Sequence, residues 1–279
     1  MKNQQGYILI MLMLVLISIG AVVSYSLISP QQLQNQILQQ RVETLQHIKQ
    51  KLIIHSQSAP EIYATESNGN FIPGANLPSP GYLPCPDTDN DGQSDTPCGQ
   101  GEDIVIGRLP ITLATRHFRL IDSFQPFIWY IVDSRYVIQN ADYNNPPLKR
   151  FTPLNMNHPG QGHIQLDQQD NLVALLIWSI DQTRPDEIST AQLSNIADLS
   201  EHRFHSNDDV TATLSHNEWR NAVLNRVGLQ KATLCDLPAD QPHWFNACNN
   251  QQGSGTAACD NDLNKPDNPT GANWREELC

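Results

Sequence analysis

The 279-residue chain has no charged side chain between Tyr7 and Ile28, and this absence sets that segment apart from the rest. As an α-helix, its 22 residues would extend about 33 Å at about 1.5 Å per residue, which is enough to cross the hydrocarbon core of a bilayer. A secretory signal peptide has a shorter apolar stretch that ends at a small-residue cleavage site. The sequence therefore predicts a membrane-spanning helix rather than such a peptide.

Basic residues are also scarce. Lysine and arginine together number 17 against 29 aspartates and glutamates, which gives a formal net charge of −12, and no cluster of basic residues is present. Nucleic-acid partners require such clusters, so we expect none. The chain also has no Gly-x-Ser-x-Gly element and no glycine-rich phosphate loop. No nucleophile can be paired with a base, and we expect the protein not to be an enzyme.

Cysteine is absent from the first 84 residues. The six cysteines that follow are Cys85, Cys98, Cys235, Cys248, Cys259 and Cys279. They lie beyond the predicted membrane helix, and their even number indicates three disulfides in an oxidising compartment. Proximity in the sequence favours pairing of Cys85 with Cys98, of Cys235 with Cys248, and of Cys259 with Cys279.

A glycine and an aromatic residue, Gly6 and Tyr7, separate the polar N-terminal residues from the apolar segment. Together with Lys2, this arrangement resembles the class III leader of type IV prepilins and type II secretion pseudopilins. The resemblance implies that a prepilin peptidase cuts after Gly6 and that Tyr7 is then methylated. It also implies a single-pass protein of the bacterial inner membrane with a periplasmic head. Such a protein joins other pilin or pseudopilin subunits through its N-terminal helix, and the filament formed in this way extends to the cell surface in part of the family.

One position departs from that family. The fifth residue after the cleavage point is Met11, where most members have a glutamate. In the family this intramembrane carboxylate pairs with the N-terminal amine of a neighbouring subunit. Its absence favours a minor pilin or pseudopilin that acts in assembly, initiation or tip presentation. The alternative is an uncleaved signal anchor on a periplasmic binding or adhesive protein that never enters a filament.

A helical stripe follows the apolar segment. Pro30 suits the first turn of a helix, and apolar residues then recur mostly at steps of three or four. They are Leu33, Ile37, Val42, Leu45, Ile48 and Leu52. This narrow stripe predicts an amphipathic continuation of the N-terminal helix that packs on one partner surface. A coiled-coil stalk has the same pattern.

Further along, apolar and alternating runs predict sheet strands. They occupy residues 104–106, 127–132, 163–167, 172–180 and 208–214. Ser215 and Glu218 form a capping box that predicts a helix ending near Gly228.

The expected domain organisation has five parts. A leader occupies residues 1–6, the transmembrane and filament helix residues 7–56, and a proline- and glycine-rich loop region residues 57–102. An α+β head with an antiparallel sheet occupies residues 103–229, and a cysteine-containing loop region occupies residues 230–279. The expected fold class is α+β and pilin-like, with a long N-terminal helix and disulfide-rich loops.

A second resemblance covers the middle of the chain. It is carried by Leu83-Pro84-Cys85-Pro86-Asp87, Cys98, Gly107-Arg108-Leu109-Pro110 and Trp129-Tyr130. These segments resemble a group of prepilin-like proteins of Gram-negative bacteria that share a Leu-Pro-Cys-Pro-Asp loop, a second cysteine, a Gly-Arg-Leu-Pro turn and a Leu-Trp-Tyr strand. Ile111 departs from the pattern, because the group has tryptophan there.

An acidic pattern lies between Cys85 and Cys98. It reads Asp-x-Asp-x-Asp-Gly-x-x-Asp, with the acids at Asp87, Asp89, Asp91 and Asp95. Carboxylates that converge in a turn are ligands that Ca²⁺ prefers, and the Gln93 backbone carbonyl would add another. Because Cys98 stands where an EF-hand has its bidentate glutamate, a helix-flanked EF-hand is excluded, and Glu102 or Asp103 would complete the set. The interpretation is a structural Ca²⁺ site; the alternative is a solvated acidic turn.

Four histidines are weaker candidates for metal ligands: His158, His163, His202 and His205. The spacing of the last two would place them on one helical face, but no third ligand can be identified, and exposed loop histidines are the commoner explanation. Among the tryptophans, Trp178 and Trp219 lie in core-like patterns. Trp244 and Trp274 are better candidates for an exposed contact.

Overall fold

The computed structural model describes residues 7, 10–18, 30–62, 79–99, 102–113, 119–121, 128–138, 162–178, 197–198, 202–206, 209–239, 243–245, 275 and 278–279. The chain divides into two compact units, residues 1–43 and 44–279, and each is described by itself. Within the described ranges, no helix is at once long enough and apolar enough to cross a bilayer. The predicted cleavage residue Gly6 lies outside them.

The described parts of the first unit are helical. Residues 10–18 form a helix, and helix α2 (Pro30–Gln57) begins at the predicted proline. On the part of α2 in this unit, Leu33, Ile37 and Val42 are each more than 40% exposed. The first half of the predicted apolar stripe is therefore not buried by the chain itself.

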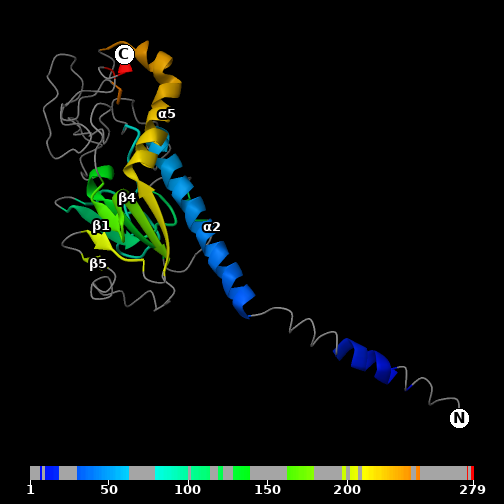
Figure 1. Ribbon diagram of the computed structural model, residues 1–279. Coiled ribbons are helices and arrows are strands. Elements are labelled where there is room, and N and C mark those ends of the chain that lie inside the picture. The colour runs from blue at the N-terminus through cyan, green and yellow to red at the C-terminus, as the bar shows by residue number, and fades with distance from the viewer. Residues whose placement is uncertain are drawn as a thin grey trace. The chain divides into compact units, whose positions relative to one another are not determined.

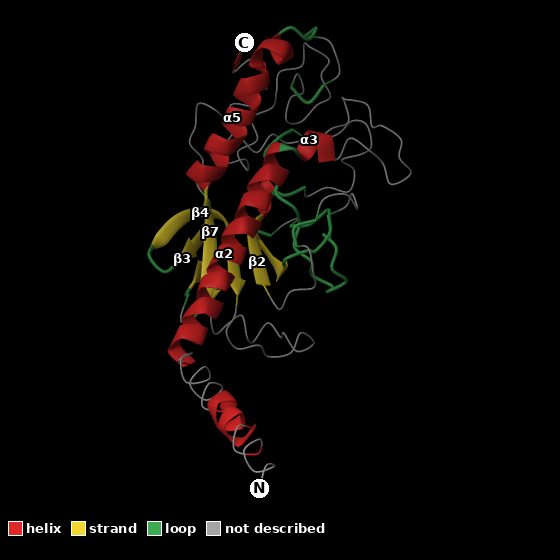
Figure 2. Ribbon diagram, turned by 90° about the vertical axis from the view of Figure 1, so that its right-hand side faces the viewer, coloured by secondary structure: helices red, strands yellow, loops and turns green. Residues whose placement is uncertain are grey.

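In the second unit the same stripe enters the core. Leu45, Ile48 and Leu52 of α2 are buried in one cluster with Trp219 and Val223 of helix α5 (His216–Cys235). Figure 2 shows α2 in front of the strands and α5 leading away from the end of β7. Burial of α2 on the sheet confirms the predicted α+β class.

Helix α5 begins at the predicted capping box but ends later than expected. The Ser215 hydroxyl accepts from the Glu218 amide at 3.2 Å, and the Glu218 carboxylate accepts from the Ser215 amide at 3.1 Å. The predicted end near Gly228 is wrong, because Gly228 is an exposed helical position where an added Cβ would meet no atom within 4 Å. The helix continues to Cys235 with Leu234 buried.

Seven strands are described, joined in one curled sheet (Figure 1). They are β1 (Ile104–Arg108), β2 (Ile128–Asp133), β3 (Ile164–Leu166), β4 (Gln169–Trp178), β5 (Ala197–Asp198), β6 (Arg203–Phe204) and β7 (Val210–Ser215). The order is β1-β2-β4-β3-β6-β5, and β7 also pairs with β4. The predicted antiparallel sheet is wrong for one pair, since β3 and β6 run parallel. A two-residue strand has no alternation from which a sequence could reveal it.

Alternation along the strands separates two apolar faces. Tyr130 of β2 pairs with Leu176 of β4, and both lie in the cluster that contains α2 and α5. The next pair, Ile131 and Leu175, faces a second cluster with Phe204 of β6. Because both faces are apolar, the central strands read as continuous apolar runs rather than as polar–apolar alternation.

The predicted loop region is ordered where it is described. The backbone carbonyl of Gly81 accepts from the Trp219 indole at 2.8 Å, and that of Pro84 accepts from the Tyr130 hydroxyl at 3.1 Å. Residues 79–87 are buried. This segment is irregular, but it belongs to the core because buried side chains of the sheet and of α5 satisfy its backbone.

The disulfides confirm one predicted pair and correct another. Cys85 is bonded to Cys98, as expected, whereas Cys235 is bonded to Cys279. The expected pairing of Cys235 with Cys248 and of Cys279 with Cys259 is therefore wrong. The residues near Cys279 return to the end of α5, where Arg275 donates to the carbonyls of Cys235 and Leu234. Cys248 and Cys259 lie outside the described residues.

Candidate metal centre and neighbouring polar clusters

The acidic loop between Cys85 and Cys98 is attached to the outer side of β1. Asp87 and Arg108 exchange both backbone hydrogen bonds, at 2.9 and 2.7 Å. The close approach requires a glycine next to Arg108, because a Cβ on Gly107 would lie 2.6 Å from the Asp87 carbonyl oxygen. In the Gly-Arg-Leu-Pro segment, the arginine thus bonds the backbone of the loop and the glycine leaves room for it.

The predicted bend at Gly92 is present. Its φ is +84°, a left-handed conformation that favours glycine. The carbonyl of Gly92 accepts from the amides of Ile111 and Thr112 at 2.9 and 3.1 Å. The loop is therefore hydrogen-bonded to residues 108–112 at two points, Asp87 and Gly92.

Three of the four predicted aspartates converge. Asp87, Asp89 and Asp95 each offer a carboxylate oxygen, and these oxygens lie within 4.8 Å of one another. Asp91 is not in this trio, and its carboxylate accepts from the backbone and side-chain amides of Gln93 at 2.7 and 2.8 Å. A role for the Gln93 carbonyl stays a prediction.

The two acids proposed to complete the set have other contacts. The Asp103 carboxylate lies 3.6 Å from the His202 ring, and the Glu102 carbonyl accepts from the Ser134 hydroxyl. Neither belongs to the trio.

Hydrogen bonds within the loop aim the carboxylates. Asp87 accepts from the amides of Asn90 and Gly92 at 2.7 and 2.9 Å, and Asp95 accepts from the amide of Thr88 at 2.6 Å. Burial nevertheless raises the pKa of Asp87, the amides of Gly92 and Asn90 lower it in part, and the charges of Asp95 and Asp91 raise it again. The charged trio therefore carries a cost that a proton or a cation would relieve.

This donor set fits a hard divalent cation. Ca²⁺ takes roughly six to eight oxygen ligands, and the trio would supply part of that shell. Across the described ranges, it is also the one group of three or more His, Cys, Asp or Glu side chains whose ligand atoms lie this close.

A second polar cluster joins the ends of four strands. Arg135 holds the buried Asp133 through two hydrogen bonds of 2.6 and 2.8 Å, and the backbone amide of His163 donates to the same carboxylate at 2.9 Å. The rings of His163 and His202 stack with centroids 6.0 Å apart, and Asp103 lies beyond His202. Burial lowers the pKa of His163, although the Asp133 charge raises it in part. This cluster fastens the starts of β3 and β6 to the end of β2.

The other predicted candidates are placed as follows. His202 precedes strand β6 and His205 follows it, so their expected position on one helical face is wrong. Trp178 and Trp219 are core residues, as predicted. Trp244 is only 6% exposed, so its expected exposed position is wrong. His158 and Trp274 lie outside the described residues.

Comparisons with protein-family models, with curated proteins and with solved structures find no match for this chain. The candidate site therefore rests on the residues and the geometry given above.

Proposed function

We propose that the protein is a minor pilin or pseudopilin subunit of a type IV pilus or type II secretion-like filament, acting in assembly, initiation or tip presentation. The observation that carries this proposal is the stripe of α2, which is exposed at Leu33 and Ile37 and buried at Leu45 and Ile48. A helix of this kind offers one apolar half to partners while its other half supports the head. The Gly6–Tyr7 junction ahead of an uncharged segment supports the same role.

The proposal includes a location and partners. The protein would be held in the bacterial inner membrane by residues 7–28, with its head in the periplasm before filament entry. Its partners would be a prepilin peptidase and other pilin or pseudopilin subunits. The role is structural, with no catalytic step and no nucleic acid.

The competing proposal is a periplasmic binding or adhesive protein on an uncleaved signal anchor. Both proposals use the same head, and they differ in the fate of the leader. The N-terminus of the mature protein therefore distinguishes them.

The first experiment is intact-mass and peptide mass spectrometry of the protein purified from its native membranes. We expect a chain that starts at methylated Tyr7. In Gly6→Val the leader should be retained, whereas Gly20→Val, the same substitution inside the apolar segment, should be cleaved normally. A wild-type chain that starts at Met1 would overturn the filament proposal and leave the signal-anchored protein.

We also propose that the acidic loop binds Ca²⁺ through Asp87, Asp89 and Asp95. The cation would neutralise the converging carboxylates and hold the loop against β1, so its role would be structural. Extracellular Ca²⁺ is plentiful enough to fill even a weak site.

This second proposal is tested by thermal unfolding with Ca²⁺ and with EDTA. A ligand at about 100 times its dissociation constant stabilises a protein by about 2.7 kcal/mol, and we expect a gain of that order. Asp89→Asn should remove most of it, whereas Asp91→Asn, the same change outside the trio, should retain it. Equal melting temperatures in Ca²⁺ and EDTA, with no Tb³⁺ luminescence, would contradict the proposal.

A further inference from the structure

Strand β7 has a neighbour on one side only. It pairs with β4, and among the described strands none pairs with its other side. The middle of β7, residues 211–213, lines a hollow of about 610 Å³. The rest of the lining comes from α2, from the turn between β3 and β4, and from Ser206. This hollow shares no residue with the acidic loop or with the histidine cluster.

The register of the sheet shows which backbone groups of β7 face away from β4. The backbone of Arg108 bonds to the acidic loop rather than to β2. Because successive residues of an antiparallel strand bond to opposite neighbours, its partner Trp129 bonds to β4, at Ile177. Ile177 is in turn opposite Thr211, whose amide and carbonyl therefore point away from β4. The same holds for Thr213, two residues further along.

The chain itself satisfies both ends of this outer edge. The Asp209 amide donates to a carbonyl three residues earlier at 2.8 Å, and the Ser215 amide donates to the Glu218 carboxylate at 3.1 Å. Between them, the amides and carbonyls of Thr211 and Thr213 have no partner in the described part of the chain. These groups have the spacing of a ladder that one more strand would complete.

The hollow follows this edge rather than one face of the sheet. Ala212 lies in the apolar cluster under α2, and Gln46 and Lys49 of α2 line the hollow from that face. The hydroxyl of Thr213 points to the opposite face, where it bonds to the side chain of Gln169 at 3.2 Å. A hollow that is lined from both faces of a sheet lies along its edge. It is therefore the space that an added strand would occupy.

The charged side chains of the lining already have partners. The Lys49 ammonium lies 2.6 Å from the Glu218 carboxylate. The Asp167 carboxylate accepts from the Ser206 hydroxyl at 2.6 Å and lies 3.4 Å from the His205 ring. Most of the other lining side chains are amides and hydroxyls. A charged partner would find no uncompensated opposite charge here, and an apolar partner would leave the amides unpaired.

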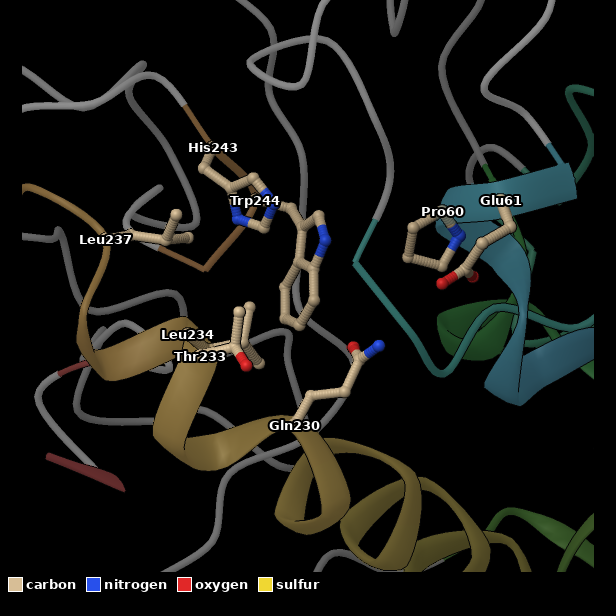
Figure 3. A pocket seen from close by; sticks show the side chains of 8 residues that line it. All are labelled: Pro60, Glu61, Gln230, Thr233, Leu234, Leu237, His243 and Trp244. Atoms are coloured by element: carbon tan, nitrogen blue, oxygen red, sulfur yellow. The ribbon is translucent and has the colours of Figure 1, made fainter.

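The hollow that Figure 3 shows has a different character. It is lined by helix α3 (Ala59–Ile62), by the end of α5 and by His243 and Trp244, and no residue of a described strand contributes to it. Trp244 is 6% exposed and belongs to the core. That hollow therefore offers no ladder of backbone groups.

We propose that β7 binds an extended segment of a partner protein as an additional strand, and that this segment carries mainly serine, threonine, asparagine or glutamine. Its backbone bonds to Thr211 and Thr213, and its alternate side chains meet the amides and hydroxyls on the two faces. A second copy of β7 would lie between the same two walls, and two recessed edges cannot reach each other. The inference concerns the second unit alone and does not depend on the filament proposal.

The test uses the full-length protein in detergent and the peptide fluorescein-Ser-Thr-Asn-Thr-Gln-Thr-Ser-amide. Comparators of the same length carry lysine, glutamate or leucine at alternate positions. Fluorescence anisotropy should show the tightest binding for the uncharged polar peptide. At about ten times its dissociation constant, this peptide should slow amide exchange at Thr211 and Thr213 about tenfold, as measured by NMR. Exchange at Ser215, whose amide is already bonded, should not change.

A proline at the edge separates strand addition from the stability of β7. Thr213→Pro removes an outward N–H and places a ring where the partner would lie, so it should weaken binding about tenfold or more. The bonds to β4 come from Ala212 and Leu214 and are retained, and proline is tolerated at such outward positions. Thr213→Val keeps the N–H and should bind within about twofold of the wild type. Circular dichroism checks folding, and the wild-type exchange measurement decides the question even if the proline variant does not fold.

Four outcomes would overturn the proposal. The first is unchanged exchange at Thr211 and Thr213 with every peptide. The second is equal affinity of the wild type and Thr213→Pro, which would place the peptide elsewhere. The third is tightest binding of a charged or leucine-containing peptide. The last is self-association in sedimentation velocity that Thr213→Pro abolishes, without binding of any peptide, which would make a second copy the occupant.

Discussion

Two irregular regions of the second unit are each closed by a disulfide, and they are held in different ways. The first part of the region 79–99, residues 79–87, runs through the core, where the Tyr82 carbonyl accepts from the buried His55 ring at 3.1 Å and the Gly81 carbonyl accepts from the Trp219 indole. At the end of α5, the described residues are tied by Arg275 and by the disulfide to Cys279. An irregular segment can thus be held by buried side chains that bond its backbone. It can also be held at a helix end by a disulfide and by an arginine that donates to the last helix carbonyls.

The largest effect is expected from the covalent bond that closes the longer loop. Cys235 and Cys279 are 44 residues apart, and Cys85 and Cys98 are 13 apart. Loop-closure entropy then gives a stabilisation of about 4 kcal/mol for the first bond and about 3 kcal/mol for the second. Urea unfolding of Cys235→Ser/Cys279→Ser and of Cys85→Ser/Cys98→Ser measures both.

Local stability separates the two regions further. Without its disulfide, the end of α5 should lose hydrogen-exchange protection at residues 230–237, because the covalent bond between this end and Cys279 would be gone and the hydrogen bonds of Arg275 would have to hold the C-terminal residues there. The loop around Asp87 should keep its protection without Cys85–Cys98, since its backbone bonds to Arg108 persist. Equal loss of protection in both variants would contradict the comparison.

Acid should destabilise the folded protein by protonating the buried His55. Burial lowers the pKa of His55 to about 4 from 6.5, although the bond to Tyr82 raises it in part. Protonation therefore favours the unfolded chain: the stability due to the neutral imidazole is complete above pH 6.5 and is lost as the pH falls toward 4. The loss at pH 4 should be about 3 kcal/mol.

Urea unfolding between pH 7 and pH 4 measures this loss. His55→Gln keeps a donor for Tyr82 but cannot titrate, so its stability should depend much less on pH. His47→Gln, an exposed position on the same helix, should behave like the wild type. A wild-type slope in His55→Gln would show that other groups cause the acid loss.

The smallest expected effects come from two glycines that differ in the space available for an added Cβ. Gly107→Ala would bring a Cβ to 2.6 Å from the Asp87 carbonyl and should destabilise the protein by about 1 to 3 kcal/mol. Gly228→Ala meets no atom within 4 Å and should stabilise α5 by about 0.5 to 1 kcal/mol. Thermal unfolding of both variants measures the difference, and two changes of the same sign would contradict it.

Periodicity predicted the parts of the head whose burial is periodic. The stripe through Leu45, Ile48 and Leu52 and the run from Ile128 to Val132 could be recognised because one side chain in three or four, or a continuous apolar run, must face the core. The bond between Cys85 and Cys98 and the convergence of three aspartates were also predictable, because both are local in sequence.

Contacts between residues far apart in the sequence could not be predicted in this way. His163 and His202 stack because they precede β3 and β6, and these two strands are parallel. Cys235 meets Cys279 because α5 passes Gly228 and the C-terminal residues come back to its end. Trp244 stands in a polar stretch of sequence and is buried for the same reason, since it lies in one apolar cluster with Leu234 of α5.

The bridge between Asp87 and Arg108 also bears on how the sheet ends. Strand β1 is the last strand on its side of the strand order, and a strand in that position is a template for pairing with another chain. At Arg108 both outward backbone groups are already bonded to Asp87. The acidic loop thus blocks the pairing of a further strand at Arg108. It also places negative charge where such a strand would have to approach.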